Sequence, residues 1–168
     1  MFKYSEFITE ARVSELLDHY NRNRDVTFHI TFRGLSYRTK TFVFVLSSEQ
    51  KNGSHKDYEV RLRLLDFKHI SRMRGPMSDK LRLAIDSEVK VNCSCPDYLF
   101  GGFKYIATQL DYAIRLENRP PDIRNPDQDG TMCKHLFYLL SHIEEFEPAM
   151  VRTLEAAKDY DYLFVPAQ

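Results

Sequence analysis

Two closely spaced pairs of residues with metal-binding side chains constrain this sequence more than any other feature. One residue separates Cys93 from Cys95, and one residue separates Cys133 from His135. Side chains two positions apart on a strand point to the same face, so the two thiols of the first pair can bind one ion. We expect the second pair in the first turn of a helix capped by Thr131, where unpaired backbone N–H groups and the positive helix end favour a thiolate.

These four side chains can complete a closed metal site. Three thiolate sulfurs at about 2.3 Å and one imidazole nitrogen at about 2.0–2.1 Å form a tetrahedron around Zn2+ and leave no position for water or substrate. We therefore predict one structural zinc ion rather than a catalytic one. Soft ligands argue against magnesium and calcium, whereas ligand identity alone does not separate zinc from iron.

Two other interpretations of the same residues stay open. Buried cysteines often pack only as small apolar side chains, although the paired spacing favours a metal. Cys133 and His135 could also form a nucleophile and its base, but no third residue is placed to orient the imidazole. The sequence contains no phosphate-binding glycine loop and no acid–base pair, so we expect no enzyme activity and no small-molecule substrate.

The composition limits the partners and the compartment. Twenty-four basic and 24 acidic side chains give a formal net charge of zero, which argues against a general polyanion binder and leaves only a local basic surface. Three cysteines cannot all pair, and the two that are one residue apart are too close for an unstrained disulfide, so we expect a reducing, cytoplasmic environment. No apolar stretch reaches the 18 residues or so of a membrane-spanning helix, and we expect no membrane partner.

The hydrophobic periodicity predicts an α+β fold with a mainly antiparallel sheet of about five strands and flanking helices. A length of 168 residues favours a single domain over residues 1–168. Alternating apolar residues predict strands at residues 26–33, 41–46, 58–64, 81–85 and 89–93, with the last two forming a hairpin. Helices are predicted at residues 5–21, within 99–116, from Thr131 onward and from Pro148 to Lys158, and the prolines at 120, 121 and 126 predict an exposed loop over residues 118–130.

The two ligand pairs resemble those of the SWIM-type zinc-binding domain. The matching segments are CSCPD at residues 93–97 and CKHL at residues 133–136, and the resemblance covers residues 81–143. It implies a zinc-clamped ββα unit, in which a hairpin supplies the first pair of ligands and a helix start supplies the second. The segment between Cys95 and Cys133 is longer than family members usually have, so the resemblance leaves the fold of residues 97–130 open.

The chain also resembles small SWIM-like proteins of tailed bacteriophages. This second resemblance is carried by the two ligand segments, by PPDI at residues 120–123, NP at residues 125–126 and Gly130, and by the opening FKYSEF at residues 2–7. It implies a component of the virion, in the capsid, neck or tail.

Two functions follow as hypotheses. The first is a non-enzymatic structural or adaptor protein in a larger assembly, which contacts other protein subunits through the sheet face, the loop over residues 118–130 and an apolar tail with Tyr160, Tyr162 and Phe164. The second, which the SWIM resemblance generally implies, is a nucleic-acid-binding module. Its basic side chains would share one outer sheet face and would be Arg61, Arg63, Lys80, Arg82 and Lys90. The neutral net charge favours the first function.

Overall fold

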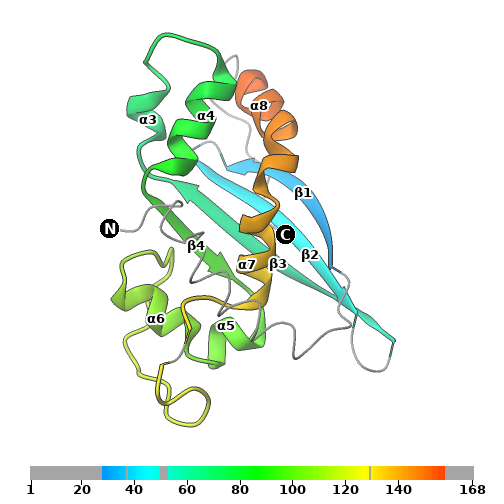
Figure 1. Ribbon diagram of the computed structural model, residues 1–168, viewed down its shortest axis with the longest axis vertical. Coiled ribbons are helices and arrows are strands. Elements are labelled where there is room, and N and C mark those ends of the chain that lie inside the picture. Colours follow the sequence, from blue (N-terminus) through cyan, green and yellow to red (C-terminus); the bar gives the residue numbers. More distant parts are fainter. Residues whose placement is uncertain (1–27, 37, 50–52, 129, 158–168) are drawn as a thin grey trace.

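An antiparallel sheet of four strands organises the described structure and confirms the predicted α+β fold. The computed structural model describes residues 28–36, 38–49, 53–128 and 130–157. The predicted N-terminal helix over residues 5–21 and the tail with Tyr160, Tyr162 and Phe164 lie outside the described residues. The strands are hydrogen-bonded in the order β1-β2-β3-β4 (Figure 1), and their bounds are β1 Phe28–Ser36, β2 Thr41–Glu49, β3 His55–Leu64 and β4 Val89–Cys93.

One face of the sheet consists of alternating apolar side chains. In β2 the side chains of Phe42, Phe44 and Leu46 are fully buried, because every second residue of a strand points to the same face. The register places Phe44 opposite Val60, and Val60 opposite Cys93. Cys93 therefore ends β4 on the same face as the hydrophobic core.

Helices cover this buried face. Helix α7 (Lys134–Ser141) contacts β3 and β4, the 3-10 helix η1 (Ile143–Phe146) follows, and α8 (Glu147–Ala156) contacts β1. Figure 1 shows this helical series running along the sheet. The ring of Phe146 meets the ring of Phe44 edge-on with centroids 5.6 Å apart, so the sheet and the helices share one core. None of the helices in the described part of the chain is long and apolar enough to cross a membrane.

The prediction of a strand over residues 81–85 is wrong, because these residues belong to helix α4 (Met77–Asp86). Helix α4 and the short helix α3 (Phe67–Ile70) before it connect β3 to β4. The expected hairpin of residues 81–85 with β4 therefore does not form, and β4 pairs with β3 instead. The spacing of the buried residues is typical of a helix with one apolar face, and these residues are Met77, Leu81, Ala84 and Ile85.

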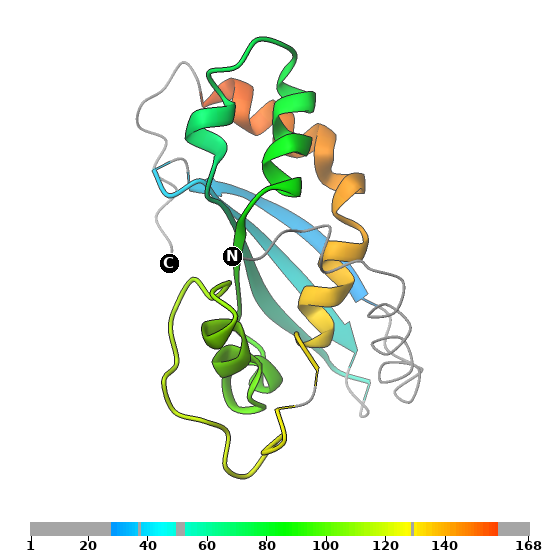
Figure 2. The same cartoon turned by 60° about the vertical axis from the view of Figure 1, so that its left-hand side comes forward.

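The segment between Cys95 and Cys133, which we call the insert (residues 96–132), lies at one end of the sheet. It contains helices α5 (Pro96–Phe100) and α6 (Phe103–Gln109), and the exposed loop predicted over residues 118–130 is confirmed for its described residues. Figures 1 and 2 show α5 and α6 at the opposite end of the sheet from α3 and α4.

Backbone hydrogen bonds attach the insert to the outer edge of β4. The N–H of Val91 donates to the carbonyl oxygen of Tyr112 at 2.7 Å, and the N–H of Ile114 donates to the carbonyl oxygen of Val91 at 2.9 Å. Gly102 allows the turn between α5 and α6 because its φ of +87° suits a residue without Cβ. A Cβ at this position would lie 3.0 Å from Cγ of Pro121, so the loop packs closely against the turn.

We predict that Leu81→Ala lowers the free energy of unfolding by about 2–5 kcal/mol, whereas Leu83→Ala changes it by about 0.5 kcal/mol or less. Leu81 is fully buried and Leu83 is 45% exposed, because α4 turns them to different sides. On a strand the two side chains would share a face. Urea unfolding of both variants measures the two losses, and equal losses would contradict the helix.

Candidate metal centre

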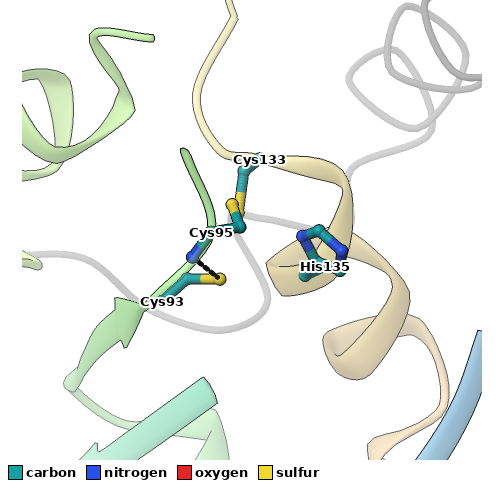
Figure 3. Close-up of side chains that lie close together, drawn as sticks. All are labelled: Cys93, Cys95, Cys133 and His135. Carbon is teal, nitrogen blue, oxygen red and sulfur yellow. Dashed lines mark hydrogen bonds between the residues drawn. The ribbon is translucent and has the colours of Figure 1, made fainter. Parts of the chain in front are cut away.

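Four side chains from three elements meet in the core beside the end of β4. Cys93 is the last residue of β4, Cys95 is the N-cap residue of α5, Cys133 is the N-cap residue of α7, and His135 lies in the first turn of α7. Each side chain is no more than 1% exposed. Figure 3 shows the four side chains gathered where the end of β4 meets the start of α7.

The spacing of the ligand atoms is compatible with one metal ion. One sulfur or ring nitrogen from each residue lies within 4.8 Å of the corresponding atoms of the other three. Ligand atoms about 2.0–2.3 Å from a tetrahedral ion lie about 3.3–3.8 Å from one another, so small side-chain movements would bring all four into contact with one ion. The predicted grouping of the two pairs is therefore confirmed.

The sheet holds the turn between the first two cysteines. The N–H of Ser94 donates to the carbonyl oxygen of Glu59 at 2.9 Å, and the N–H of Glu59 donates to Ser94 Oγ at 2.8 Å. These two bonds continue the pairing of β3 with β4 one residue beyond Cys93. Ser94 is exposed, whereas Cys93 and Cys95 are buried, so both thiols face the core as the alternation predicts.

Backbone N–H groups point at two of the three sulfurs. The N–H of Cys95 donates to Cys93 Sγ at 3.4 Å, and the N–H of Tyr98 donates to Cys95 Sγ at 3.3 Å. Such bonds stabilise a sulfur that carries negative charge, and they orient it toward a cation. Helix α5 supplies the second bond because Cys95 caps it and Pro96 begins it, a position that suits proline.

The prediction of Thr131 as the cap of the next helix is wrong, because the N-cap residue of α7 is Cys133. The backbone of Cys133 is extended, and its carbonyl oxygen accepts the N–H of Phe137 at 3.1 Å. The carbonyl oxygen of Thr131 instead accepts the hydroxyl of Tyr112, which ties this segment to the rest of the insert. Cys133 thus lies at the positive end of α7, where a thiolate is favoured, and His135 follows in the same turn.

Burial and mutual contact shift the thiol pKa values in opposite directions. Burial raises the pKa of Cys133, and its hydrogen bonds with Cys93 and Cys95 raise it further. Hydrogen bonds with Cys133 and Cys93 lower the pKa of Cys95, so its neighbours favour the charged form of this thiol. A metal ion has to displace the remaining protons when it binds.

Two tyrosines line the cluster. The ring of Tyr58 lies beside the imidazole of His135, with centroids 4.5 Å apart and planes inclined by 48°. Tyr98 is fully buried, and its hydroxyl donates to the carbonyl oxygen of Val91 at 3.3 Å. Burial raises the pKa of Tyr98, and the proximity of Cys133 raises it further. Tyr58 thus packs on the histidine, and Tyr98 ties α5 to β4 beside the cluster.

The supporting residues Tyr58, Tyr98 and Ser94 have no counterpart in the sequence prediction. Tyr58 belongs to an alternating strand pattern in which it resembles any other core residue. Tyr98 and Ser94 take their roles from contacts with other elements. One local signal does exist, because Pro96 directly after Cys95 is typical of a helix start and identifies Cys95 as a cap.

The five basic residues predicted on one sheet face do not share a face. Arg61, Arg63 and Lys90 lie on β3 and β4, whereas Lys80 and Arg82 lie on α4. The strand wrongly expected at residues 81–85 is the cause. Each of the five has a polar partner. Three form ion pairs, which are Arg61 with Glu59 (2.6 Å), Arg82 with Glu147 (2.7 Å) and Lys90 with Asp111 (2.7 Å). The other two donate hydrogen bonds, Arg63 to Thr41 Oγ1 (3.1 Å) and Lys80 to the Ser71 carbonyl oxygen (3.2 Å).

Comparison of the chain with protein-family models, with curated proteins and with solved structures yields no match. The metal centre is therefore defined by the four buried residues themselves and by their arrangement.

We predict that Ser94→Ala weakens metal binding about tenfold, because residues that orient metal ligands typically contribute that much. The substitution removes the acceptor of the Glu59 N–H and leaves every ligand in place. Titration with Co2+, followed by its visible absorption, measures the affinity. Ser71→Ala is the matched control, since it removes an exposed hydroxyl bonded to the Lys68 carbonyl. If Ser94→Ala bound Co2+ as tightly as the unmodified protein, the backbone pairing of β3 with β4 alone would be enough to hold the turn between Cys93 and Cys95.

Proposed function

We propose that the chain is a non-enzymatic adaptor protein in which Cys93, Cys95, Cys133 and His135 bind one structural zinc ion. The observation that carries this proposal is the burial of all four ligands in one cluster. A catalytic zinc keeps one position open for water or substrate, whereas a structural zinc has four protein ligands. A fully buried set of four ligands fits the structural type.

The donor set favours zinc. Three thiolates and one imidazole are a common set of ligands for structural zinc, and thiolates are poor ligands for magnesium and calcium. Iron binds similar ligands, and metal analysis of the purified protein distinguishes it from zinc. The resemblance to the SWIM-type domain supports zinc as well, because one pair of ligands follows a strand and the other lies at a helix start.

The ion would act as a clamp. Cys95 and Cys133 are 38 positions apart (133 minus 95), and the first begins α5 while the second begins α7. An ion held by both therefore closes the two ends of the insert on the end of β4. Because the unfolded chain has no such prepared site, metal binding would stabilise the folded state directly.

The insert carries the surface that we propose for partner contacts. Phe100 is 71% exposed and Ile123 is 93% exposed. Among the described residues, eight large apolar side chains are exposed, and five of these belong to the insert. We propose that these residues form one protein-binding surface, since contiguous exposed apolar patches mark such surfaces. The five residues are Leu99, Phe100, Leu110, Leu116 and Ile123.

The partner would be another protein subunit in a larger assembly. The resemblance to small SWIM-like proteins of tailed bacteriophages supports a place in the capsid, neck or tail of a virion. A nucleic-acid-binding module is the alternative, and it is less well supported because the five basic side chains are divided between the sheet and α4. Arg61, Arg82 and Lys90 also pair with carboxylates, which offset part of the local positive charge.

We predict that replacing Phe100 and Ile123 together with serine abolishes capture of a partner protein and leaves the melting temperature unchanged. Both side chains are exposed, so the folded core loses no buried surface. Affinity purification of the full chain from cells that contain its natural partners, followed by mass spectrometry, makes the measurement. Leu83→Ser is the matched control, since it removes an exposed leucine from α4.

Two outcomes would contradict the adaptor proposal. One is capture of the same partner by the double variant. The other is retention of nucleic acid alone, with an affinity that falls steeply with salt and is lost when Arg61, Arg63 and Arg82 are neutralised. That second result would favour the nucleic-acid-binding module.

A further inference from the structure

Tyr58 packs against one residue of the candidate metal centre. Its ring lies beside the imidazole of His135, with centroids 4.5 Å apart, and the Nζ of Lys56 lies 5.6 Å from the centroid of the same ring. His135 is 1% exposed, Tyr58 is 7% exposed, and Lys56 is exposed. Exposure therefore increases stepwise from the ligand, through the tyrosine ring, to the lysine at the surface.

The strand register explains why Tyr58 occupies this position. Val60 lies opposite Cys93, the last residue of β4. Tyr58 is two residues before Val60 on the same face of β3, so it extends past the end of β4. The contact with His135 places its ring beside the start of α7. At this margin of the sheet the tyrosine ring covers a ligand that β4 does not reach.

A ring contact of this kind can orient a histidine ligand. The imidazole must present one nitrogen to the ion, and neighbouring groups that limit its rotation raise metal affinity and slow metal loss. Contact between two rings depends on the aromatic surface, not on the phenol hydroxyl. Phenylalanine should therefore replace Tyr58 without loss, whereas a small side chain should not.

We infer that Tyr58 is the positioning residue for His135 and the gate through which the metal ion exchanges. This inference rests on the metal site proposed above. It adds that the ion leaves by displacement of one aromatic side chain at the margin of the sheet, while the rest of the core stays folded. The rate of metal loss is then set locally at Tyr58, separately from the global stability.

The test measures transfer of the ion from the full-length Zn2+-loaded protein to excess EDTA, well below the melting temperature. In Tyr58→Ala the ion should leave about tenfold faster than in the unmodified protein. The Co2+-loaded form of this variant should also show altered visible absorption, because His135 is no longer held in one orientation. Tyr58→Phe should restore both the slow release and the original spectrum.

Leu81→Ala is the control for a general loss of packing. Leu81 is fully buried on α4, at the opposite end of the sheet from α5 and α6 (Figure 1), so this variant loses core contacts but leaves the surroundings of the tyrosine ring unchanged. Its release rate and Co2+ spectrum should match those of the unmodified protein.

Three results would overturn the inference. Unchanged release in Tyr58→Ala would show that the ring is no gate. Equal acceleration in Leu81→Ala would show that the ion leaves by general opening of the core. In both cases the metal site itself would stand. An unmodified protein that takes up neither Zn2+ nor Co2+ would overturn the metal site and the gate together, and this distinguishes the two failures.

Discussion

Three thiols and an imidazole packed side by side in an apolar core are the physical constraint on which the rest of the structure depends. Each of the four residues is no more than 1% exposed, and buried polar or charged groups are costly unless they are paired. Burial raises the pKa of Cys133, and contact with Cys93 and Cys95 raises it further, because deprotonating more than one thiol in this space would place like charges together. One divalent cation at the centre would replace this repulsion with attraction to a common point.

Hydrogen bonds and helix starts in the surrounding structure position the clustered side chains. The pairing of β3 with β4 extends through Ser94 and Glu59 and fixes the turn between the first two cysteines. Cys95 caps the start of α5 and Cys133 caps the start of α7. An ion bound to both residues would therefore fix the two helix starts relative to each other. The insert is also attached to β4 through Val91. A metal ion bound at the cluster would therefore stabilise the base that carries the exposed apolar residues of the insert.

The four clustered residues and all four described strands could be predicted from the sequence because their patterns are local. Leu83 shows where local patterns fail, since it belongs to an alternating apolar run yet lies exposed on α4, and only packing against the other elements decides between strand and helix. The contacts of Ser94 with Glu59 and of Tyr58 with His135 join residues 35 and 77 positions apart (135 minus 58). No local pattern specifies such contacts, so they follow only from the folded structure.

The most direct test of this account is the metal content of the full chain, purified without added metal and measured by mass spectrometry beside Cys133→Ser. The account predicts about one zinc ion per chain in the native protein. It also predicts loss of this zinc and a lower melting temperature in the variant, because the ion contributes to folding. A native protein without stoichiometric metal, together with a variant of unchanged melting temperature, would contradict the account and leave the cysteines as ordinary packing residues.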